Sequence, residues 1–330
     1  MKTSLRISLV LLAMTLAALH PAFSQSKPAS KTAGAKHGLA LNTLLFNRVA
    51  HAPARRIGKP APDPVALGFA KAKVYKFATA DYPGADGSLV FDNNVATSVG
   101  EFTFGGASPV TAFTVKGNVY KTLAVPGSTV SIATAITTAG VIGGTYLDLS
   151  SAAHGFVDNA GTFTNIDFPG ATTTELIGMN DAGDIVGDYL DGSSVDHGYV
   201  DQGGVFTSID FPGATGTAAT QINSAGDIVG EWSDGTTTHG FLLSGGVFSS
   251  LDFPLSTSTI AWGINDSGDI SGAYVDAASA SHGFLYSGGA WTKVDVAGAT
   301  GTELRRVKNN GVITGLFVDD LTEVHGIRGH

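Results

Sequence analysis

Five histidines occupy the same place in a repeating sequence pattern, and imidazole is the commonest metal ligand in proteins. Each is followed by glycine, and the series is His154, His197, His239, His282 and His325. Ligands of one zinc ion lie roughly 4 Å apart, whereas equivalent residues of neighbouring repeats lie much farther apart. We therefore expect each imidazole to hold its own repeat together through a hydrogen bond. The candidate partners are the repeated aspartates Asp167, Asp210 and Asp252.

Two acidic turns carry oxygen ligands of the kind that calcium prefers. They hold Asp181 with Asp184, and Asp266 with Asp269, in the pattern Asn-Asp-x-Gly-Asp. Both turns lack the alternating ligand spacing and the closing glutamate of an EF-hand loop. Asn and Asp also form the side-chain-to-backbone hydrogen bonds of tight turns. A structural role in turns is the favoured interpretation, weak Ca²⁺ binding is the alternative, and no other cofactor is expected.

The residues that break the repeat are the candidates for ligand binding, because a functional site needs a constellation that is not repeated. They are Trp232, Trp262, Trp291, Arg305 and Arg306. An exposed tryptophan can stack on a sugar ring, although core packing is the commoner use. Arg305 and Arg306 form the only adjacent cationic pair after residue 66, and a surface role is open to them. No catalytic residue is proposed, because the sequence contains no Gly-x-Ser-x-Gly, His-Glu-x-x-His or phosphate-loop motif.

These residues belong to a repeat of about 43 residues that organises the chain after a proline-rich segment. The element Asp-aromatic-Pro-Gly-Ala and its weaker copies recur at Pro83, Pro126, Pro169, Pro212, Pro254 and Ala297. Within one period, β-branched residues flank an Asn-x-x-Gly turn at 223–226, and a second hairpin turns at the Gly pair 245–246. Each period therefore predicts four short antiparallel strands.

Stacked four-stranded repeats of this length are typical of propeller blades. The sequence therefore predicts an all-β fold, a six-bladed β-propeller, over residues 67–330. The last copy ends after the strand around 325–328, and the strand that should follow it is present at 74–77. We expect this N-terminal strand to complete the last blade and close the ring. An open β-solenoid is the alternative, although the capping ends that it needs are not evident.

The motifs His-Gly-Phe, Asp-Phe-Pro-Gly-Ala and Asn-Asp-x-Gly-Asp-Ile-Val-Gly resemble those of the HAF family of extracellular repeats, found in secreted bacterial proteins. The resemblance covers about residues 69–330. It is strong from His154 to Ala299 and weaker at both ends, where Val125-Pro126-Gly127 departs from the pattern. It implies an exported domain built from repeats and does not name a ligand.

The N-terminal region has the features of an export signal. Lys2 and Arg6 precede an apolar stretch at 7–18, and Ala22-Phe23-Ser24 is a small-x-small cleavage site. That stretch is shorter than the roughly 20 apolar residues that span a bilayer. We therefore expect a cleaved signal peptide at 1–24, a flexible basic linker at 25–66, and a mature protein in the periplasm or outside the cell without a membrane span.

Charge narrows the possible partners. Residues 67–330 carry ten Lys and Arg against 27 Asp and Glu, so this region repels phosphate backbones and nucleic acid is not an expected partner. We expect a monomeric, non-catalytic binding or scaffold module for an extracellular glycan or protein. The alternatives are a glycan-directed hydrolase or lyase with its site at the channel mouth, and a structural component of a cell surface or matrix.

Overall fold

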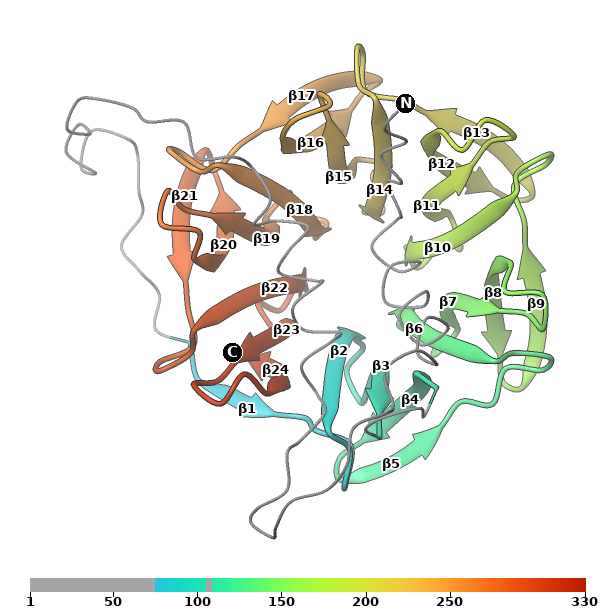
Figure 1. The fold of residues 1–330 in the computed structure, drawn as a ribbon, viewed down its shortest axis with the longest axis horizontal. Helices are drawn as coiled ribbons and strands as arrows, with labels where there is room; N and C mark the ends of the chain where they lie inside the picture. Colours follow the sequence, from blue (N-terminus) through green and yellow to red (C-terminus); the bar gives the residue numbers. More distant parts are fainter. Residues whose placement is uncertain (1–74, 105–108) are drawn as a thin grey trace, which may run out of the picture.

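The structure is a computed structural model that describes residues 75–104 and 109–330. These residues form strands β1 to β24, which assemble into six separate four-stranded sheets. Figure 1 shows the sheets as blades around one central axis, the six-bladed β-propeller that the repeat predicts. The described residues include no helix long and apolar enough to cross a membrane. The expected signal peptide (1–24) and linker (25–66) lie outside the described residues.

Each blade is an antiparallel sheet that runs outward from the axis. The innermost strands of blades 1 to 6 are β2 (Gly87–Asn93), β6 (Val130–Ile136), β10 (Thr173–Met179), β14 (Gly216–Ile222), β18 (Ser258–Ile264) and β22 (Gly301–Val307). The second strands are β3 (Thr97–Thr103), β7 (Ile142–Leu147), β11 (Ile185–Leu190), β15 (Ile228–Ser233), β19 (Ile270–Val275) and β23 (Ile313–Val318). The third strands are β4 (Thr111–Lys116), β8 (Ala153–Asn159), β12 (Asp196–Gln202), β16 (Thr238–Ser244), β20 (Ser281–Ser287) and β24 (Val324–Gly329). The outermost strands are β5 (Val119–Thr122), β9 (Thr162–Ile166), β13 (Val205–Ile209), β17 (Val247–Leu251), β21 (Ala290–Val294) and β1 (Phe77–Thr79).

The turn chemistry of one period explains why each blade folds. In blade 4, Asn223 Oδ1 accepts hydrogen bonds from the backbone N–H groups of Ala225 and Asp227, which closes the turn between β14 and β15. Gly226 takes a φ of 85° there, in the left-handed region that favours glycine. The Gly245-Gly246 pair, with φ values of 57° and 79°, turns the chain from β16 to β17. Both predicted hairpins are present.

A glycine in each second strand lets the blade pack closely, and in blades 1 to 5 it packs against an aromatic ring. In blade 4, a Cβ on Gly230 would lie 2.1 Å from the carbonyl oxygen of Ala218 and 2.7 Å from Cε1 of Phe241. In every blade the innermost strand has a β-bulge directly after the residue that pairs with this glycine. In blade 4, Ala219 pairs with Gly230 and the register shifts before Gln221. The Ile-Val-Gly motif therefore reflects a packing requirement, since any side chain at this glycine would displace the core.

Aromatic stacks join blades 1, 3, 4 and 5 to the segments that enter them. Phe168 of Asp-Phe-Pro stacks on Tyr189 of blade 3 with ring centroids 3.7 Å apart. Phe211 stacks on Trp232 of blade 4 in the same way, at 4.1 Å. Ring pairs of this geometry add stability beyond the burial of their area. The Asp-Phe-Pro-Gly-Ala element is therefore the connection that fixes one blade against the next.

The N-terminal strand closes the ring, as the sequence predicts. Strand β1 pairs antiparallel with β24, so blade 6 contains both ends of the described chain. Its paired residues lie at 77–79, slightly after the predicted strand at 74–77. The closure is reinforced where Ala80 donates its N–H to the Gly326 carbonyl and His325 Nδ1 lies 2.9 Å from Asp81 Oδ2. Figure 1 shows β1 as the outer strand of the red blade.

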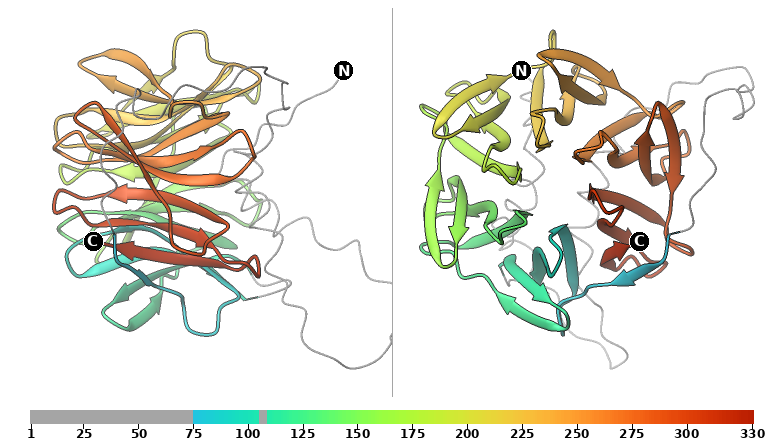
Figure 2. Two further views of the ribbon diagram at one scale, coloured as in Figure 1. Left: turned by 90° about the vertical axis from the view of Figure 1, so that its left-hand side faces the viewer. Right: turned by 180° about the vertical axis from the view of Figure 1, so that it is seen from behind.

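The two ends of the strands form two faces of the propeller, which the side view of Figure 2 separates. We call the end with the turns between innermost and second strands the inner-turn face. We call the opposite end the His–Asp face, because the repeated histidines at the start of the third strands lie there. These two faces hold the two groups of candidate site residues.

Candidate functional site at the channel mouth

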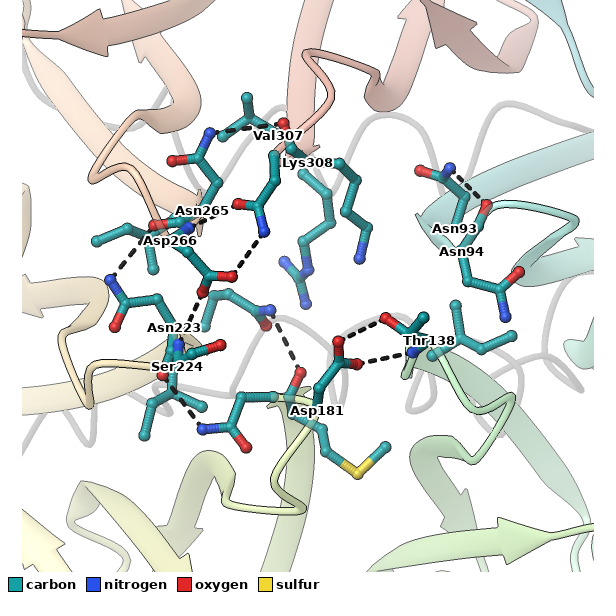
Figure 3. A pocket seen from close by; sticks show the side chains of 18 of the residues that line it. Asn93, Asn94, Thr138, Asp181, Asn223, Ser224, Asn265, Asp266, Val307 and Lys308 are labelled. Carbon is teal, nitrogen blue, oxygen red and sulfur yellow. Dashed lines mark hydrogen bonds between the residues drawn. The ribbon is translucent and has the colours of Figure 1, made fainter.

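A cavity of about 220 Å³ opens at the axis of the inner-turn face and is lined by residues of all six blades. We call it the mouth pocket. Its labelled residues in Figure 3 come from the last residues of the innermost strands and from the turns that follow them: Asn93, Asn94, Thr138, Asp181, Asn223, Ser224, Asn265, Asp266, Val307 and Lys308. The wall also includes aliphatic side chains such as Ile136 and Ile264, and none of its lining residues is aromatic. Hydrogen bonds, rather than ring stacking, must therefore select a ligand here.

The turn asparagines hold the rim of the mouth pocket in place by bonding to the next blade. Asn180 Nδ2 donates to the Asn223 carbonyl at 3.2 Å, and Asn223 Nδ2 donates to the Asn265 carbonyl at 3.3 Å. Asn94 of blade 1 similarly donates to the Thr137 carbonyl at 3.1 Å. Neighbouring turns are thus tied together, and the rim is organised before any ligand arrives.

The predicted calcium residues serve these turns as hydrogen-bond acceptors. Asp181 accepts from the N–H and hydroxyl of Thr138 in blade 2. Asp266 accepts from the Ser224 N–H at 2.9 Å and from Asn309 Nδ2 at 2.6 Å, and these hydrogen bonds lower its pKa. The remaining two, Asp184 and Asp269, accept from the asparagine of their own turn. The four carboxylates are thus engaged separately, and calcium binding by them stays a prediction.

Arg306 forms the floor of the mouth pocket. It is 3% exposed and lies on the innermost strand of blade 6. Its Nη1 donates to the Trp262 carbonyl of blade 5, and its Nη2 donates to the carbonyls of Ile177 in blade 3 and Thr134 in blade 2. Burial lowers the pKa of Arg306 to about 10, while Asp92 favours the charged form, so the guanidinium stays charged at neutral pH. One side chain therefore links four blades across the axis.

Three buried polar atoms of the mouth pocket have no hydrogen-bond partner within the described residues. They are Asn93 Oδ1, Gln221 Oε1 and Arg306 Nε. Asn93 is 2% exposed and Gln221 is 6% exposed, so bulk water does not solvate them freely. Leaving a buried polar group unpaired costs about 1–3 kcal/mol. Two acceptors and one donor on residues that line the pocket are therefore left without a protein partner in the described part of the chain.

Beneath the floor, Arg305 occupies the axis between blades 5, 6 and 1. Its guanidinium stacks over the Trp262 ring at 3.9 Å, and its Nη2 lies 2.7 Å from Glu303 Oε2. Glu101 of blade 1 is also buried, and burial raises its pKa to about 8 although Arg305 opposes the shift. At neutral pH Glu101 is therefore mostly protonated, which avoids a second buried carboxylate charge beside one arginine.

The structure corrects the expectation of a surface role for Arg305 and Arg306, because both are buried at the axis. Inside the propeller, Arg306 donates hydrogen bonds to backbone carbonyls and Arg305 stacks on an aromatic ring. These contacts stabilise the buried cations, whereas their charge alone suggested a surface position. Trp262 and Trp291 are buried too, and Trp232 is stacked between Phe211 and His239. The tryptophans are therefore packing residues in this arrangement. Of the five candidates, only Arg306 lines the mouth pocket.

Sequence reasoning missed Asn93 and Gln221, although one signal for Gln221 was available. The same position of the innermost strand, next to the bulge, holds Asp92, Ala135, Gly178, Gln221, Gly263 and Arg306. Three of these residues are small, whereas the other three reach toward the axis or the mouth. A comparison of the repeats at this position would have found Gln221 together with Arg306.

On the His–Asp face, each repeated imidazole lies between two carboxylates. In blade 4, His239 Nδ1 lies 3.1 Å from Asp252 Oδ1, and Nε2 lies 3.8 Å from Asp234 Oδ2. The corresponding Nδ1 contacts join His154 to Asp167, His197 to Asp210, His282 to Asp295 and His325 to Asp81. The histidines thus bond within their own blades, in the manner that the repeat suggested.

No protein-family model matches the chain, and no curated protein does. Solved structures similar to it include TolB from Acinetobacter baumannii, with 11% sequence identity and a TM-score of 0.53 over 73% of this chain. The chain spans 65% of that TolB chain. AofleA from Arthrobotrys oligospora has 13% identity and a TM-score of 0.49, covering 77% of this chain and 86% of AofleA. The six-bladed fucose-recognising lectin of Aleuria aurantia has 13% identity and a TM-score of 0.46, covering 76% and 93%. At these identities the likeness concerns the fold alone.

Proposed function

We propose that the protein is an exported, non-catalytic binding module that holds the terminal unit of a neutral extracellular glycan in the mouth pocket. The observation that carries the proposal is the set of three buried atoms without a hydrogen-bond partner in the described residues, Asn93 Oδ1, Gln221 Oε1 and Arg306 Nε, whose residues line one cavity. The export signal pattern at 1–24 supports a location outside the cytoplasm.

Hydroxyl groups fit this set of atoms better than any single charged group. A hydroxyl donates one hydrogen bond and accepts two, so neighbouring hydroxyls of a sugar satisfy the amide oxygens of Asn93 and Gln221 and the N–H of Arg306 together. A carboxylate would pair with Arg306 and leave both amide oxygens facing another acceptor. The aliphatic side chains of Ile136 and Ile264 provide apolar surface for the C–H groups of a sugar ring.

The charges around the mouth pocket favour an uncharged ligand. Its lining contains two carboxylates, Asp181 and Asp266, and two cations, Arg306 and Lys308. Lys308 Nζ lies 2.6 Å from Asp92 Oδ1, so its charge is already paired. Asp266 has a lowered pKa, which suits a permanent hydrogen-bond acceptor and not the protonated general acid of a glycosidase. Binding without cleavage is therefore the favoured activity.

The floor of the pocket favours the end of a chain over its middle. Arg306 bonds to three carbonyls of other blades, one of them that of Trp262, and the Trp262 ring stacks on Arg305. A polymer could thread through the axis only by breaking these buried contacts. A terminal residue can enter from the inner-turn face and reach the unpartnered atoms. The rest of the glycan would then extend into solvent.

The direct test is saturation-transfer NMR of the full chain with neutral hexoses and with oligosaccharides that end in them. Gln221→Ala should weaken binding at least about tenfold, because one buried amide oxygen is worth roughly 1–3 kcal/mol. Blade 2 carries alanine at the equivalent position, Ala135, so this change suits the fold. Asp252→Asn on the His–Asp face is the control and should bind like the unaltered chain. Unchanged binding by Gln221→Ala would rule out the mouth pocket as the glycan site.

A further inference from the structure

One loop of the His–Asp face carries a carboxylate that its counterparts lack. In blades 2 to 6 the loop between the second and third strands begins with an aspartate and leads to the repeated histidine. In blade 6 the loop runs from Asp319 to His325 and contains Glu323. The loops of blades 2, 3 and 5 have Ala152, Val195 and Ala280 at the same place. Since the repeat does not require an acid here, Glu323 is an addition specific to blade 6.

The loop backbone that presents Glu323 has the conformation shared by its counterparts. Asp319 Oδ1 accepts from the Glu323 N–H at 2.7 Å, and the Asp319 N–H donates to the Glu323 carbonyl at 3.0 Å. In blade 2, Asp148 and Ala152 make the same two bonds at 2.9 and 3.0 Å. Blade 2 is thus a natural counterpart that differs by the missing carboxylate.

His325 is oriented for metal ligation from outside the loop. Its Nδ1 lies 2.9 Å from Asp81 Oδ2, and its ring stacks on Phe317 with centroids 4.8 Å apart. Asp81 follows strand β1, so this carboxylate comes from the segment that closes the ring. A carboxylate on one imidazole nitrogen fixes the tautomer and leaves the other nitrogen as a metal ligand, an arrangement common at zinc sites. Here the other nitrogen, Nε2, faces Asp319 Oδ2 at 3.5 Å.

From this geometry we propose that Asp319, Glu323 and His325 bind a zinc ion through Asp319 Oδ2, a Glu323 carboxylate oxygen and His325 Nε2. Their ligating atoms all lie within 4.8 Å of one another, and no other such trio of His, Cys, Asp or Glu occurs in the described residues. Tetrahedral zinc with bonds near 2.0–2.2 Å separates its ligands by about 3.4 Å, close to the observed Nε2–Oδ2 distance. Two carboxylates balance the charge of the ion, and a water molecule would complete four ligands.

The site lies on the face opposite the mouth pocket and does not depend on glycan binding. Its position at the ring closure has a consequence of its own. Zinc on Nε2 makes the Nδ1–H of His325 a stronger donor to Asp81, and Asp81 also accepts from the Gly326 N–H at 3.2 Å. Metal binding would therefore stabilise the junction between the N-terminal segment and blade 6.

The test is isothermal titration of the chelator-treated full chain with Zn²⁺, accompanied by the absorption spectrum of the Co²⁺-loaded protein. We expect one equivalent of Zn²⁺ and the visible bands of four-coordinate Co²⁺. Glu323→Ala should weaken Zn²⁺ binding at least about tenfold, and Asp81→Asn should weaken it about 10- to 100-fold through the orientation of His325. Circular dichroism of each variant checks that the propeller is folded.

Ala152→Glu supplies the matched gain of function, because it adds the missing carboxylate to the same loop in blade 2. It should raise the stoichiometry from one to two Zn²⁺ per chain. Wild-type protein that binds no Zn²⁺ up to about 1 mM would overturn the proposal, since structural and catalytic zinc sites bind far more tightly. So would equal binding by Glu323→Ala, because the ion would then be held by an Asp–His pair common to the other blades.

Discussion

The two faces of the propeller use the same repeat in different ways. On the His–Asp face, five blades carry a histidine between two aspartates at nearly constant distances. On the inner-turn face, one position beside the bulge holds Arg306 in blade 6, Gln221 in blade 4 and Gly178 in blade 3. Residues that serve a single blade recur, whereas residues that meet at the shared axis differ because each fills a different part of one space. Departures from the repeat near the axis are therefore the better guide to a binding site.

The largest expected effect comes from removing the axial cation. Arg306→Met leaves the carbonyls of Trp262, Ile177 and Thr134 without their donor, so we expect the free energy of unfolding to fall by about 3–5 kcal/mol. Urea denaturation at neutral pH measures the change. Lys293→Met is the matched control on the His–Asp face, where an exposed Lys293–Asp295 pair at 3.0 Å should contribute less than about 1 kcal/mol. Equal losses in the two variants would contradict the contrast between the faces.

The next effect concerns the pH dependence of the buried axis. Burial raises the folded-state pKa of Glu101 from its ordinary value of 4.5 to about 8, so its contribution to stability is full below pH 4.5 and is lost as pH rises through 8. Glu101→Gln removes this titration, and the variant should be more stable than the wild type at pH 9 by about 2–3 kcal/mol. Denaturation curves at pH 5, 7 and 9 test this. Asp320→Asn, an exposed change, should leave the profile unaltered.

A smaller effect on stability is expected from two aspartates, of which Asp266 bonds to the flanking blades and Asp252 bonds to the histidine of its own blade. Asp266→Asn weakens bonds to Ser224 and Asn309 in the flanking blades, and we expect a loss of about 1–2 kcal/mol. Asp252→Asn alters an aspartate whose side chain is 42% exposed, and the loss should stay below about 1 kcal/mol. Since the pKa of Asp266 is lowered in the fold, its contribution is present above the unfolded-state value and is lost as pH falls through the folded one. Melting curves at pH 7 and pH 3 compare the two variants.

The smallest expected effect is that of calcium. Asp181 and Asp266 already accept hydrogen bonds from neighbouring blades, and they are not gathered around one point. Addition of about 1 mM Ca²⁺ to chelator-treated protein should therefore raise the melting temperature by less than about 1 °C, because a ligand stabilises only the state that binds it. A larger increase would support the calcium alternative and would make the inner turns metal sites.

Most of the fold could be predicted from the sequence because a propeller repeats local information. The Asn-x-x-Gly turn and the Gly245-Gly246 pair specify hairpins through contacts within a few residues. The six periods, together with the predicted N-terminal strand at 74–77 that lies apart from its own blade in the sequence, then predict a closed ring. The mouth pocket could not be predicted in this way, because Arg306 contacts Thr134 and Ile177 only after six blades have assembled. A pair of arginines in an otherwise acidic region suggests a position on the surface. The neighbouring sequence does not indicate that backbone carbonyls of other blades accept hydrogen bonds from Arg306.

The pairing of β1 with β24 also determines the order in which the fold can be completed. Blade 6 needs strands from both ends of the described chain, with Asp81 and His325 separated by 244 residues. Blades 1 to 5 each consist of consecutive strands and can form one after another as the chain is synthesised. The sixth cannot form until β24 has followed them, so β1 stays unpaired until the whole described chain has been made. Closure is therefore a late, long-range step, and the incomplete sixth blade is exposed to edge-to-edge association until the last strand arrives.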